Sequence, residues 1–304
     1  MRVIIFSGIL FLLLLLPTVD AQDGIPYDEY ATQYLDSDGG GTLIIHLMPE
    51  NFLDSSGEWR KINNSLRLLS PSDSAYQYGY RYGATDGLLD VYAKTNIAAS
   101  YPFAVNMSDY AVQYAPASVG YLDYGTKEYK VLQEVQPSIA KVQGNKITFV
   151  DAWYDMNITR TLDSWRWKEE IIMGTLAKTW MQNNPPSDFG LSNSDSYLVF
   201  RFNMRVSNLK MGKNGNNNEL SSFEVDQGRM EFRDALGNMK WFLPLEDAYE
   251  LNNVSSKVPI KFRIVGAGST RDLYFGVKVS DLNTMSFPVV LDPTDTSATI
   301  NGDT

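Results

Sequence analysis

Tyrosines occupy every second position of one short stretch of this 304-residue chain. In AYQYGYRYG they alternate with Gln77, Gly79 and Arg81, and they are Tyr76, Tyr78, Tyr80 and Tyr82. Successive side chains of a β-strand point to opposite faces, so a strand here would place all four rings on one face. Sugar rings or another chain could stack on such a face. The alternative, which we favour, is that the rings pack between sheets or cover a half-exposed sheet.

Acidic residues are the abundant groups that could perform acid–base chemistry. Two carboxylates at the right separation suffice for a glycosidase. The candidates that lie among aromatic residues are Asp151, Asp155, Glu169 and Glu170. With 36 acidic residues in the chain, such neighbours arise by chance, and Glu169–Glu170 follows Lys168 as in an ordinary charged strand. We therefore expect no enzymatic activity, and a carboxylate glycosidase is the remaining catalytic alternative.

Most other active sites require residues that the sequence lacks. His46 is the only histidine and lies in an apolar run, where packing in a core or on a sheet face is the simplest interpretation. There is no cysteine, so neither a nucleophile–base triad nor a zinc site has enough ligands. Asp36 and Asp38 open a stretch like a calcium loop, but no glutamate closes it. We expect no metal and no cofactor.

The N-terminus has the pattern of an export signal. Arg2 precedes an apolar run from Val3 to Leu16, and Val19-Asp20-Ala21 fits a cleavage site after Ala21. The run is shorter than the about 20 residues of a membrane-spanning helix, and no second long apolar segment follows. We predict that residues 1–21 are a signal peptide and that the mature chain is secreted, extracellular or at the cell surface, without a membrane span. A retained N-terminal anchor is the alternative.

Charge and sequons fit an exported protein. The formal net charge is −10 and no basic cluster interrupts it, which disfavours binding to nucleic acid. Without disulfides, stability must come from the core. Asn-x-Ser/Thr sequons predict surface glycosylation, and they begin at Asn63, Asn106, Asn157 and Asn253.

Short apolar runs predict that β-strands position the tyrosines, the carboxylates and the sequons. From Leu88 to Ile139 the runs LLDVYAK, PFAVNM, YAVQYA, VGYLDY and EYKVLQEV recur at a spacing of about ten residues. Parallel strands need longer connections, so the spacing indicates an antiparallel arrangement. We predict an all-β fold of antiparallel β-sandwich modules, one or two packed together. At most one or two short helices accompany them, one of them over Thr175–Asn183.

The clearest individual strands lie in the second half of the chain. Tyr197–Val206 alternates apolar and polar residues, and Arg229–Pro244 has the pattern of a hairpin. Three further strands are predicted, at Ile260–Val265, Leu273–Val279 and Phe287–Leu291. In the middle one, Leu273, Phe275, Val277 and Val279 share one face, as in a half-buried antiparallel strand.

Polar and proline-rich stretches predict the divisions of the chain. Residues 22–41 are polar, acidic and glycine-tipped, and we interpret them as an N-terminal arm. A first β-rich subdomain covers residues 42–184 and a second covers 185–294, with Asn184-Pro185-Pro186 as the boundary. Residues 295–304 lack an apolar pattern and resemble a linker, so we expect packing to stop at Pro293.

Five stretches, taken in order, resemble the patterns of one known family. Gly57–Leu66 (GEWRKINNSL) is similar to W-x-x-I-D-N-S-L, and Ile147–Ile158 is similar to Y-x-N-V-Y-x-x-V-D-L with Asn157 in place of the usual Asp. Lys168–Ile172 (KEEII) looks like K-E-x-I. Asp234–Pro244 (DALGNMKWFLP) looks like D-x-x-G-N followed by L-P, and Phe287–Thr294 (FPVVLDPT) is close to Y-P-V-x-I-D-P-T.

Together these stretches resemble the N-terminal β-rich region of large secreted bacterial and archaeal proteins. In that family the region precedes YD-repeat (Rhs-like) segments or the sandwich domain named DNRLRE after its sequence motif. The resemblance spans about residues 42–294 and implies an extracellular scaffold or adhesin-like module, often joined to a C-terminal domain. It assigns no catalytic residues.

These observations predict a structural or interaction protein of the cell surface or extracellular matrix. Its expected partners are a second copy, neighbouring surface proteins or glycans. Strand exchange through the arm or the C-terminal tail is the expected mode of self-assembly. A carbohydrate-binding module that uses the face of Tyr76–Tyr82 is the alternative.

Overall fold

The structure is a computed structural model that describes residues 2–5, 25–28, 30–35, 41–45, 49–54, 56–107, 109–164, 166–213, 215–216 and 219–298. His46, the stretch Asp36–Asp38, most of the predicted signal peptide and the end of the tail lie outside these residues. In the described part, 25 strands accompany two α-helices and two 3-10 helices. This confirms the predicted all-β class with short helices.

Two large antiparallel sheets form a sandwich, and sheet I is built around β11 (Tyr110–Asp123). One side of β11 pairs with β17 (Ser196–Ser207). The other side pairs with β10 (Phe103–Met107) and then with β12 (Tyr129–Glu134). The sheet continues from β10 through β9 (Asp90–Ala93), β8 (Tyr82–Ala84) and β7 (Arg67–Leu68). From β17 it continues through β24 (Thr270–Lys278), β23 (Asn253–Val265) and β19 (Phe223–Val225).

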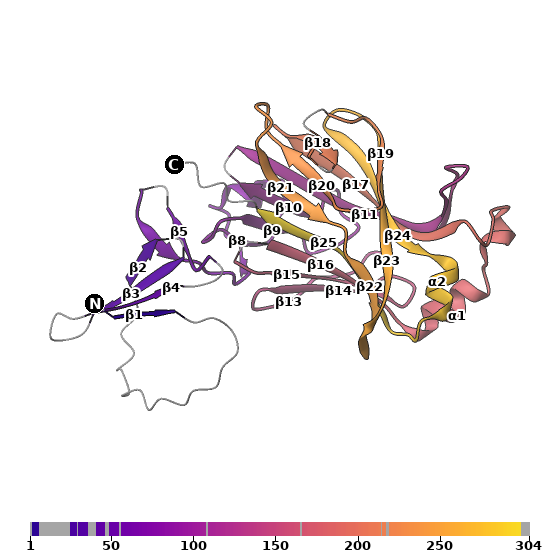
Figure 1. Ribbon diagram of the computed structural model, residues 1–304, viewed down its shortest axis with the longest axis horizontal. Helices are drawn as coiled ribbons and strands as arrows, with labels where there is room; N and C mark the ends of the chain where they lie inside the picture. The colour runs from indigo at the N-terminus through magenta and orange to yellow at the C-terminus, as the bar shows by residue number, and fades with distance from the viewer. Residues whose placement is uncertain are drawn as a thin grey trace.

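Sheet II is built around β25 (Val289–Ala298). One side of β25 pairs with β16 (Arg166–Met173), followed by β15 (Met156–Leu162), β14 (Lys146–Trp153) and β13 (Lys141–Gln143). Its other side pairs with β22 (Asp247–Glu250) and with β21 (Met239–Pro244), followed by β20 (Arg229–Arg233) and β18 (Lys210–Lys213). Strand β23 pairs with β22 through its first half and with β24 through its second, so it joins the two sheets (Figure 1).

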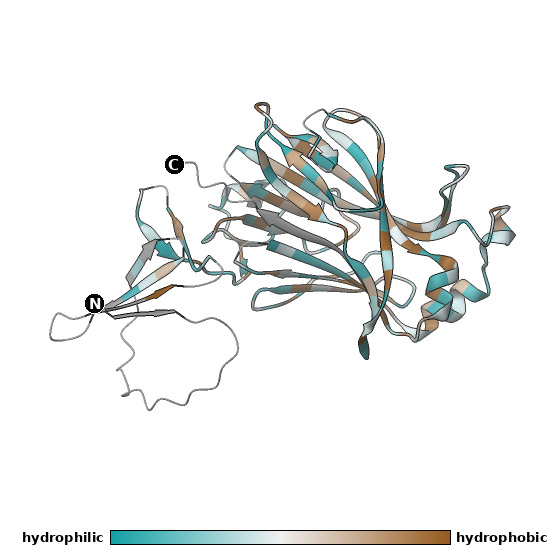
Figure 2. Ribbon diagram, viewed as in Figure 1, coloured by the Kyte–Doolittle hydropathy of each residue, from teal (hydrophilic) through white to brown (hydrophobic). Residues whose placement is uncertain are grey.

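One hydrophobic core fills the space between the sheets. Every second residue of β16 from Trp167 to Met173 is buried, as expected for a strand with one face on the core. Aromatic rings span the sandwich, since the ring centroids of Trp153 in sheet II and Phe200 in sheet I lie 5.0 Å apart. Figure 2 shows hydrophobic and hydrophilic residues alternating along the strands. Burial of these rings is the main stabilising contribution to such a fold.

The predicted boundary at Asn184–Pro186 does not separate two cores. Strands on either side of it pair directly, as β11 does with β17 and β16 with β25. A single cluster of buried side chains extends from Leu66 to Leu291. The two proline residues instead belong to a connection at the end of the sandwich, because proline is poorly suited to a strand interior.

The predicted break between two strands near Pro116 and the predicted end of the fold at Pro293 are also wrong. The runs YAVQYA and VGYLDY form the single strand β11, in which a bulge between Pro116 and Ser118 accommodates the proline. Strand pairing continues past Pro293, because β25 runs to Ala298 and Thr296 pairs with Trp167 of β16. By contrast, β17 confirms the predicted strand Tyr197–Val206, and β20 with β21 confirms the predicted hairpin Arg229–Pro244.

Both helices cross from one sheet to the other at the same end of the sandwich (Figure 1). Helix α1 (Thr175–Gln182) follows β16 of sheet II and leads through η2 (Pro186–Phe189) to β17 of sheet I. It confirms the predicted helix. Helix α2 (Val279–Thr284) replaces the predicted end of a strand at Val279 and leads from β24 of sheet I to β25 of sheet II.

A small sheet lies at the opposite end of the molecule (Figure 1). Its strand order is β1 (Arg2–Ile5), β4 (Gly41–Ile45), β3 (Ala31–Leu35) and β2 (Ile25–Asp28). The hairpin of β5 (Asn51–Leu53) and β6 (Trp59–Lys61) lies against it, and Asn51 donates a hydrogen bond of 2.8 Å to the carbonyl of Ala31. The described residues of the predicted arm therefore pair within their own chain.

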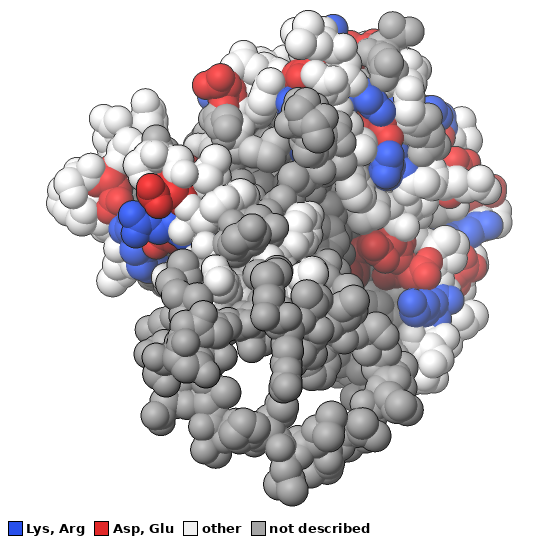
Figure 3. All heavy atoms as spheres, turned by 60° about the vertical axis from the view of Figure 1, so that its left-hand side comes forward, with Lys and Arg blue, Asp and Glu red and all other residues white. Residues whose placement is uncertain are grey.

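The described surface adds two constraints. None of the described helices has both the length and the apolar character needed to cross a membrane. On the face shown in Figure 3, acidic and basic side chains are interspersed among the described residues. The described residues on that face form no large basic patch (Figure 3).

Candidate binding site at the helical end

Helix α1 is held in place by Asp155, from the turn between β14 and β15. Its Oδ2 accepts hydrogen bonds from the backbone N–H groups of Leu176 (2.7 Å) and Ala177 (3.1 Å). The residue before the helix, Gly174, leaves room for this carboxylate, because a Cβ there would lie 2.2 Å from Oδ2. Asp155 thus caps a helix whose own N-cap residue has no side chain.

The rest of α1 is attached to sheet I and to the segment that follows α2. The hydroxyl of Tyr121 in β11 donates a 2.9 Å hydrogen bond to the carbonyl of Asn184, and Asn184 Nδ2 donates to the carbonyl of Trp180 at 2.8 Å. Burial, and secondarily the charge of Asp188, raises the pKa of Tyr121 to about 12, so this donor stays protonated. Lys178 Nζ donates to the carbonyl of Met285, which follows α2, at 2.7 Å. The two helices are therefore fixed relative to each other.

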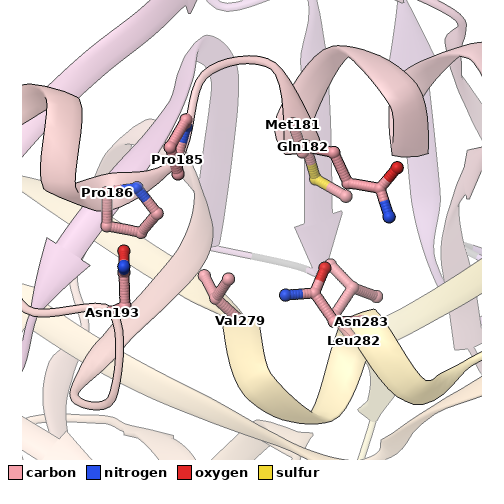
Figure 4. A pocket seen from close by; sticks show the side chains of 8 residues that line it. All are labelled: Met181, Gln182, Pro185, Pro186, Asn193, Val279, Leu282 and Asn283. Atoms are coloured by element: carbon pink, nitrogen blue, oxygen red, sulfur yellow. The ribbon is translucent and has the colours of Figure 1, made fainter.

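A pocket of about 270 Å³ opens between α1, η2 and α2 (Figure 4). Its floor is apolar and consists of Met181, Pro185, Pro186, Val279 and Leu282. Its polar lining consists of three carboxamides, those of Gln182, Asn193 and Asn283. Gln182 and Asn283 face each other from the two helices, and Asn193 lies at the other end of the pocket (Figure 4).

Charge does not contribute to the lining of this pocket, since all eight lining residues are neutral. A carboxamide can both donate and accept hydrogen bonds, so the rim suits a neutral polar group. Asn193 Oδ1 already accepts the N–H of Ser187 at 3.1 Å. Gln182 and Asn283 are exposed, which leaves their amide groups accessible from solvent.

An exposed aromatic pair lies on another face of α1. The side chain of Tyr154 is 47% exposed, and its ring centroid lies 5.9 Å from that of the half-buried Trp180. Leu176, one turn before Trp180 on the same helix face, is 57% exposed. The backbone N–H of Tyr154 is held by Gln133 Oε1 at 2.9 Å. These three side chains form an exposed apolar patch of the kind that commonly marks a contact site.

The predicted tyrosine face does not form. Residues 74–78 make the 3-10 helix η1 (Ser74–Tyr78), so the predicted strand is wrong there. Tyr78 is 69% exposed, whereas Tyr80 is only 4% exposed and lies 5.8 Å from the ring of Tyr92. Tyr80 belongs to a small cluster on the outer side of sheet I, and Tyr82 begins β8. The favoured alternative, that the rings pack between sheets or cover a sheet, describes three of the four tyrosines. Tyr76 packs against the same cluster as Tyr80, and Tyr82 packs against the main core.

Local turn chemistry explains this difference. Asp73 accepts the N–H of Ser70 at 2.6 Å and pairs with Arg67 at 2.7 Å, which closes a turn just before η1. Gly79 ends η1 with a φ of +87°, a conformation that favours glycine. Alternating tyrosines are equally compatible with such a turn, because their period alone does not determine the backbone.

The four candidate carboxylates have separate structural environments. Glu169 is buried and paired with Arg160, and Glu170 on the opposite face of β16 accepts the hydroxyl of Tyr249 at 3.3 Å. Asp151 is exposed, and Asp155 caps α1. In addition, no group of three or more His, Cys, Asp or Glu side chains in the described part of the chain could hold a metal ion.

The sequons differ in their exposure. Asn63 and Asn253 are exposed, whereas Asn106 in β10 and Asn157 in β15 are half-buried. Asn157 Oδ1 accepts the backbone N–H of Asp151 at 2.8 Å, and Thr159 of the same sequon is only 5% exposed. Occupancy of these four sites stays a prediction.

The sequence did not reveal the residues that line the pocket, for a physical reason. The pocket combines residues 181–193 with residues 279–283, which are far apart in the chain and meet only through the pairing of the sheets. The paired prolines and the neighbouring asparagines are a local signal, and they were interpreted as a domain boundary. No family model, curated protein or solved structure matches this chain, so the resemblance to secreted β-rich regions stays a prediction.

Proposed function

We propose that this protein is an extracellular interaction protein of the cell surface or matrix, and that it binds through the helical end. The helical end comprises α1, η2, α2 and the turn that carries Tyr154. The contact between the exposed Tyr154 and the half-buried Trp180, on the helix that also lines a neutral pocket with another face, is the observation that supports this function. Aromatic groups are frequent energetic centres of binding sites, and the predicted export signal supports a location outside the cell.

Contact through side chains fits the structure better than strand exchange. Residues 25–28 of the arm pair with residues 31–35, which in turn pair with β4. The C-terminal strand β25 has partners on both sides in sheet II. Exchange of either segment would first break these pairings, whereas the helical end is accessible without any rearrangement.

Binding to the surface of the producing cells tests this proposal. The purified protein is labelled and its binding curve is compared with that of a Tyr154→Ala, Trp180→Ala double variant. Tyr78→Ala is the matched control, because Tyr78 is also an exposed tyrosine but lies in η1. We expect the double variant to weaken binding at least about tenfold, in line with loss of a binding hot spot, and the control to change nothing.

Equal binding by the wild type and the double variant would contradict the helical end as the binding site. Unfolding curves of all three proteins show whether the fold is kept. Sedimentation of the same samples at high concentration tests whether the partner is a second copy, which the double variant should then no longer bind.

A further inference from the structure

Three charged side chains meet on the outer face of sheet II, where β16 pairs with β25. The amine Nζ of Lys168 lies 2.7 Å from Oδ2 of Asp292 and 3.1 Å from Oε1 of Glu170. Lys168 and Glu170 alternate with the core residues of β16, so they point away from the core. Asp292 belongs to β25, the strand paired with β16. An amine, a carboxyl partner and a second carboxylate are therefore held together by two adjacent strands.

This cluster is largely shielded from water. The side chains of Lys168, Glu170 and Asp292 are only 22%, 21% and 14% exposed. Tyr249 of β22 donates its hydroxyl to Oε1 of Glu170 at 3.3 Å, which adds a half-buried ring to the cluster. Exclusion of water strengthens the contacts between charged groups and limits the hydrolysis of any bond formed between them.

Two other lysine pairs in the described part of the chain show what is particular to this one. Lys127 contacts Glu224, but its side chain is 42% exposed. Lys240 lies 3.4 Å from Asp234, whose carboxylate already accepts three hydrogen bonds from its own turn. At Lys168 a short contact, low exposure and a second carboxylate coincide.

The geometry of Lys168 and Asp292 is that of an amine about to attack a carboxyl carbon. One C–O bond separates Oδ2 from that carbon, so Nζ lies at most about 4 Å from it, close to the roughly 3–3.5 Å of reacting atoms. Burial lowers the pKa of Lys168, but the hydrogen bonds and charges of Asp292 and Glu170 outweigh burial and raise it. The pair therefore starts as ammonium and carboxylate, and a group that accepts the ammonium proton is required. Glu170 is in contact with Nζ and can accept it.

We propose that Lys168 and Asp292 condense to an amide bond that links β16 to β25, with Glu170 as the proton relay. Nζ forms a bond to Cγ of Asp292, and one Cγ–O bond breaks. Glu170 passes two protons in turn from Nζ to the departing oxygen, which leaves as water, and Glu170 ends unchanged. The positive charge of Lys168 and the negative charge of Asp292 disappear together, and nothing is oxidised or reduced.

Fixed geometry makes such a condensation feasible in water. Effective concentrations of well-oriented groups reach roughly 10⁵–10⁸ M, far above those of free amines and acids. The product closes a covalent loop over residues 168–292, which constrains the unfolded chain as a disulfide does. The chain has no cysteine that could form a disulfide. This bond lies outside the binding proposed for the helical end, and neither proposal depends on the other.

Mass spectrometry of the purified full chain tests the proposal, with protein from a host that lacks N-glycosylation and with its N-terminus determined. We expect the wild type to be lighter than its sequence by the mass of one water. A protease digest should then contain one peptide in which Lys168 is joined to Asp292. Lys168→Arg and Asp292→Ala should both have the full mass of their sequences. Lys240→Arg is the matched control, because Lys240 is similarly shielded and also contacts an aspartate, and it should still lose one water.

The role of Glu170 has its own variant. Glu170→Gln keeps the size of the side chain but removes the proton acceptor, so it should slow formation of the amide at least about tenfold although both joined residues are present. Lys168→Arg keeps a positive charge beside Asp292, so it remains informative if Asp292→Ala fails to fold. A wild type of full mass overturns the proposal, and so does loss of water without the joined peptide. Amide formation in Glu170→Gln at the wild-type rate overturns the relay.

Discussion

Arg160 and Glu169 form an ion pair inside the hydrophobic core, where they face each other from the adjacent strands β15 and β16. Their side chains are only 3% and 1% exposed. The guanidinium carbon of Arg160 lies 4.2 Å from the ring centroid of Phe103 and 5.1 Å from that of Trp167. Burial raises the pKa of Glu169, and the positive charge of Arg160 opposes this rise. A charge pair thus occupies a position that an apolar pair could fill.

Removal of one partner should be much more harmful than removal of both. Glu169→Gln leaves the Arg160 charge buried without a counter-charge, so we expect it to lower the free energy of unfolding by about 3–5 kcal/mol. Arg160→Met combined with Glu169→Leu removes both charges and should be neutral or stabilising. Urea unfolding of the two variants measures the difference. Equal free energies of unfolding for the single and the double variant would show that an unpaired buried charge is not the cause of the destabilisation.

Asp90 should make stability depend on pH. Burial is the main cause that raises its pKa from 3.8 to about 6, with a smaller contribution from Asp86 and an opposing hydrogen bond of 3.4 Å from Tyr92. A raised pKa means that the folded state binds more protons than the unfolded state between these two values. Stability therefore falls as the pH rises from about 4 to about 6, and the loss persists above that range.

Asp90→Asn removes this ionisation. We expect the free energy of unfolding of the variant to exceed that of the wild type by about 1 kcal/mol at pH 7, a value that is discounted for the partial exposure of the side chain. At pH 3.5 we expect no difference. Asp226→Asn, an exposed carboxylate, is the control. Thermal unfolding across this pH range gives the difference curve, and a gain that is the same at every pH would contradict the assignment.

Asp155 should couple the stability of α1 to binding. Asp155→Ala removes the acceptor for the N–H groups of Leu176 and Ala177 and should cost about 1–2 kcal/mol. Asp155→Asn keeps an oxygen acceptor and a residue type that tolerates the φ of +54° at this position, so it should cost less. Attachment to cells should weaken in the same order. Unchanged attachment by a measurably destabilised Asp155→Ala variant would show that the cap does not affect the site.

Gly276 should not tolerate any side chain. It lies in β24 between β17 and β23, and an added Cβ would come within 1.9 Å of the carbonyl oxygen of Leu198. Because this neighbour is backbone, Gly276→Ala must displace a central strand, at a cost of about 3 kcal/mol or more. At Gly87 the nearest atom is a methyl group of Ile62 at 3.3 Å, so Gly87→Ala is the tolerated control. Soluble yield and unfolding midpoints distinguish the two.

Glycosylation should depend on the exposure of each sequon. In a host with the N-glycosylation machinery we expect occupancy at Asn63 and Asn253, which are exposed, and none at Asn157. At Asn157 the amide oxygen is bound to Asp151 and the sequon threonine is buried. Peptide mass spectrometry of the protein purified from such a host measures occupancy. A fully occupied Asn157 would mean that modification precedes folding of β15.

Local signals in the sequence were sufficient for several elements. The alternation in β17 and in β24, the turn residues of the β20–β21 hairpin and the span of α1 are properties of neighbouring residues, so they were predictable. The tyrosines at 76–82 show the limit of such signals. Their period of two fits a strand, but Asp73 and Gly79 stabilise a turn and a 3-10 helix instead.

The sequence by itself determined that the chain is β-rich and antiparallel, because strand period and turn residues are local patterns. The N-terminal apolar run is a local pattern too, and it predicts an export signal. Only the tertiary structure decided that β25 continues past Pro293, since its partner strands lie elsewhere in the chain. It also decided that Met181 and Leu282 line one pocket. Such contacts depend on which strands pair across about a hundred residues, and the hydrophobic pattern of a single segment does not specify its partner.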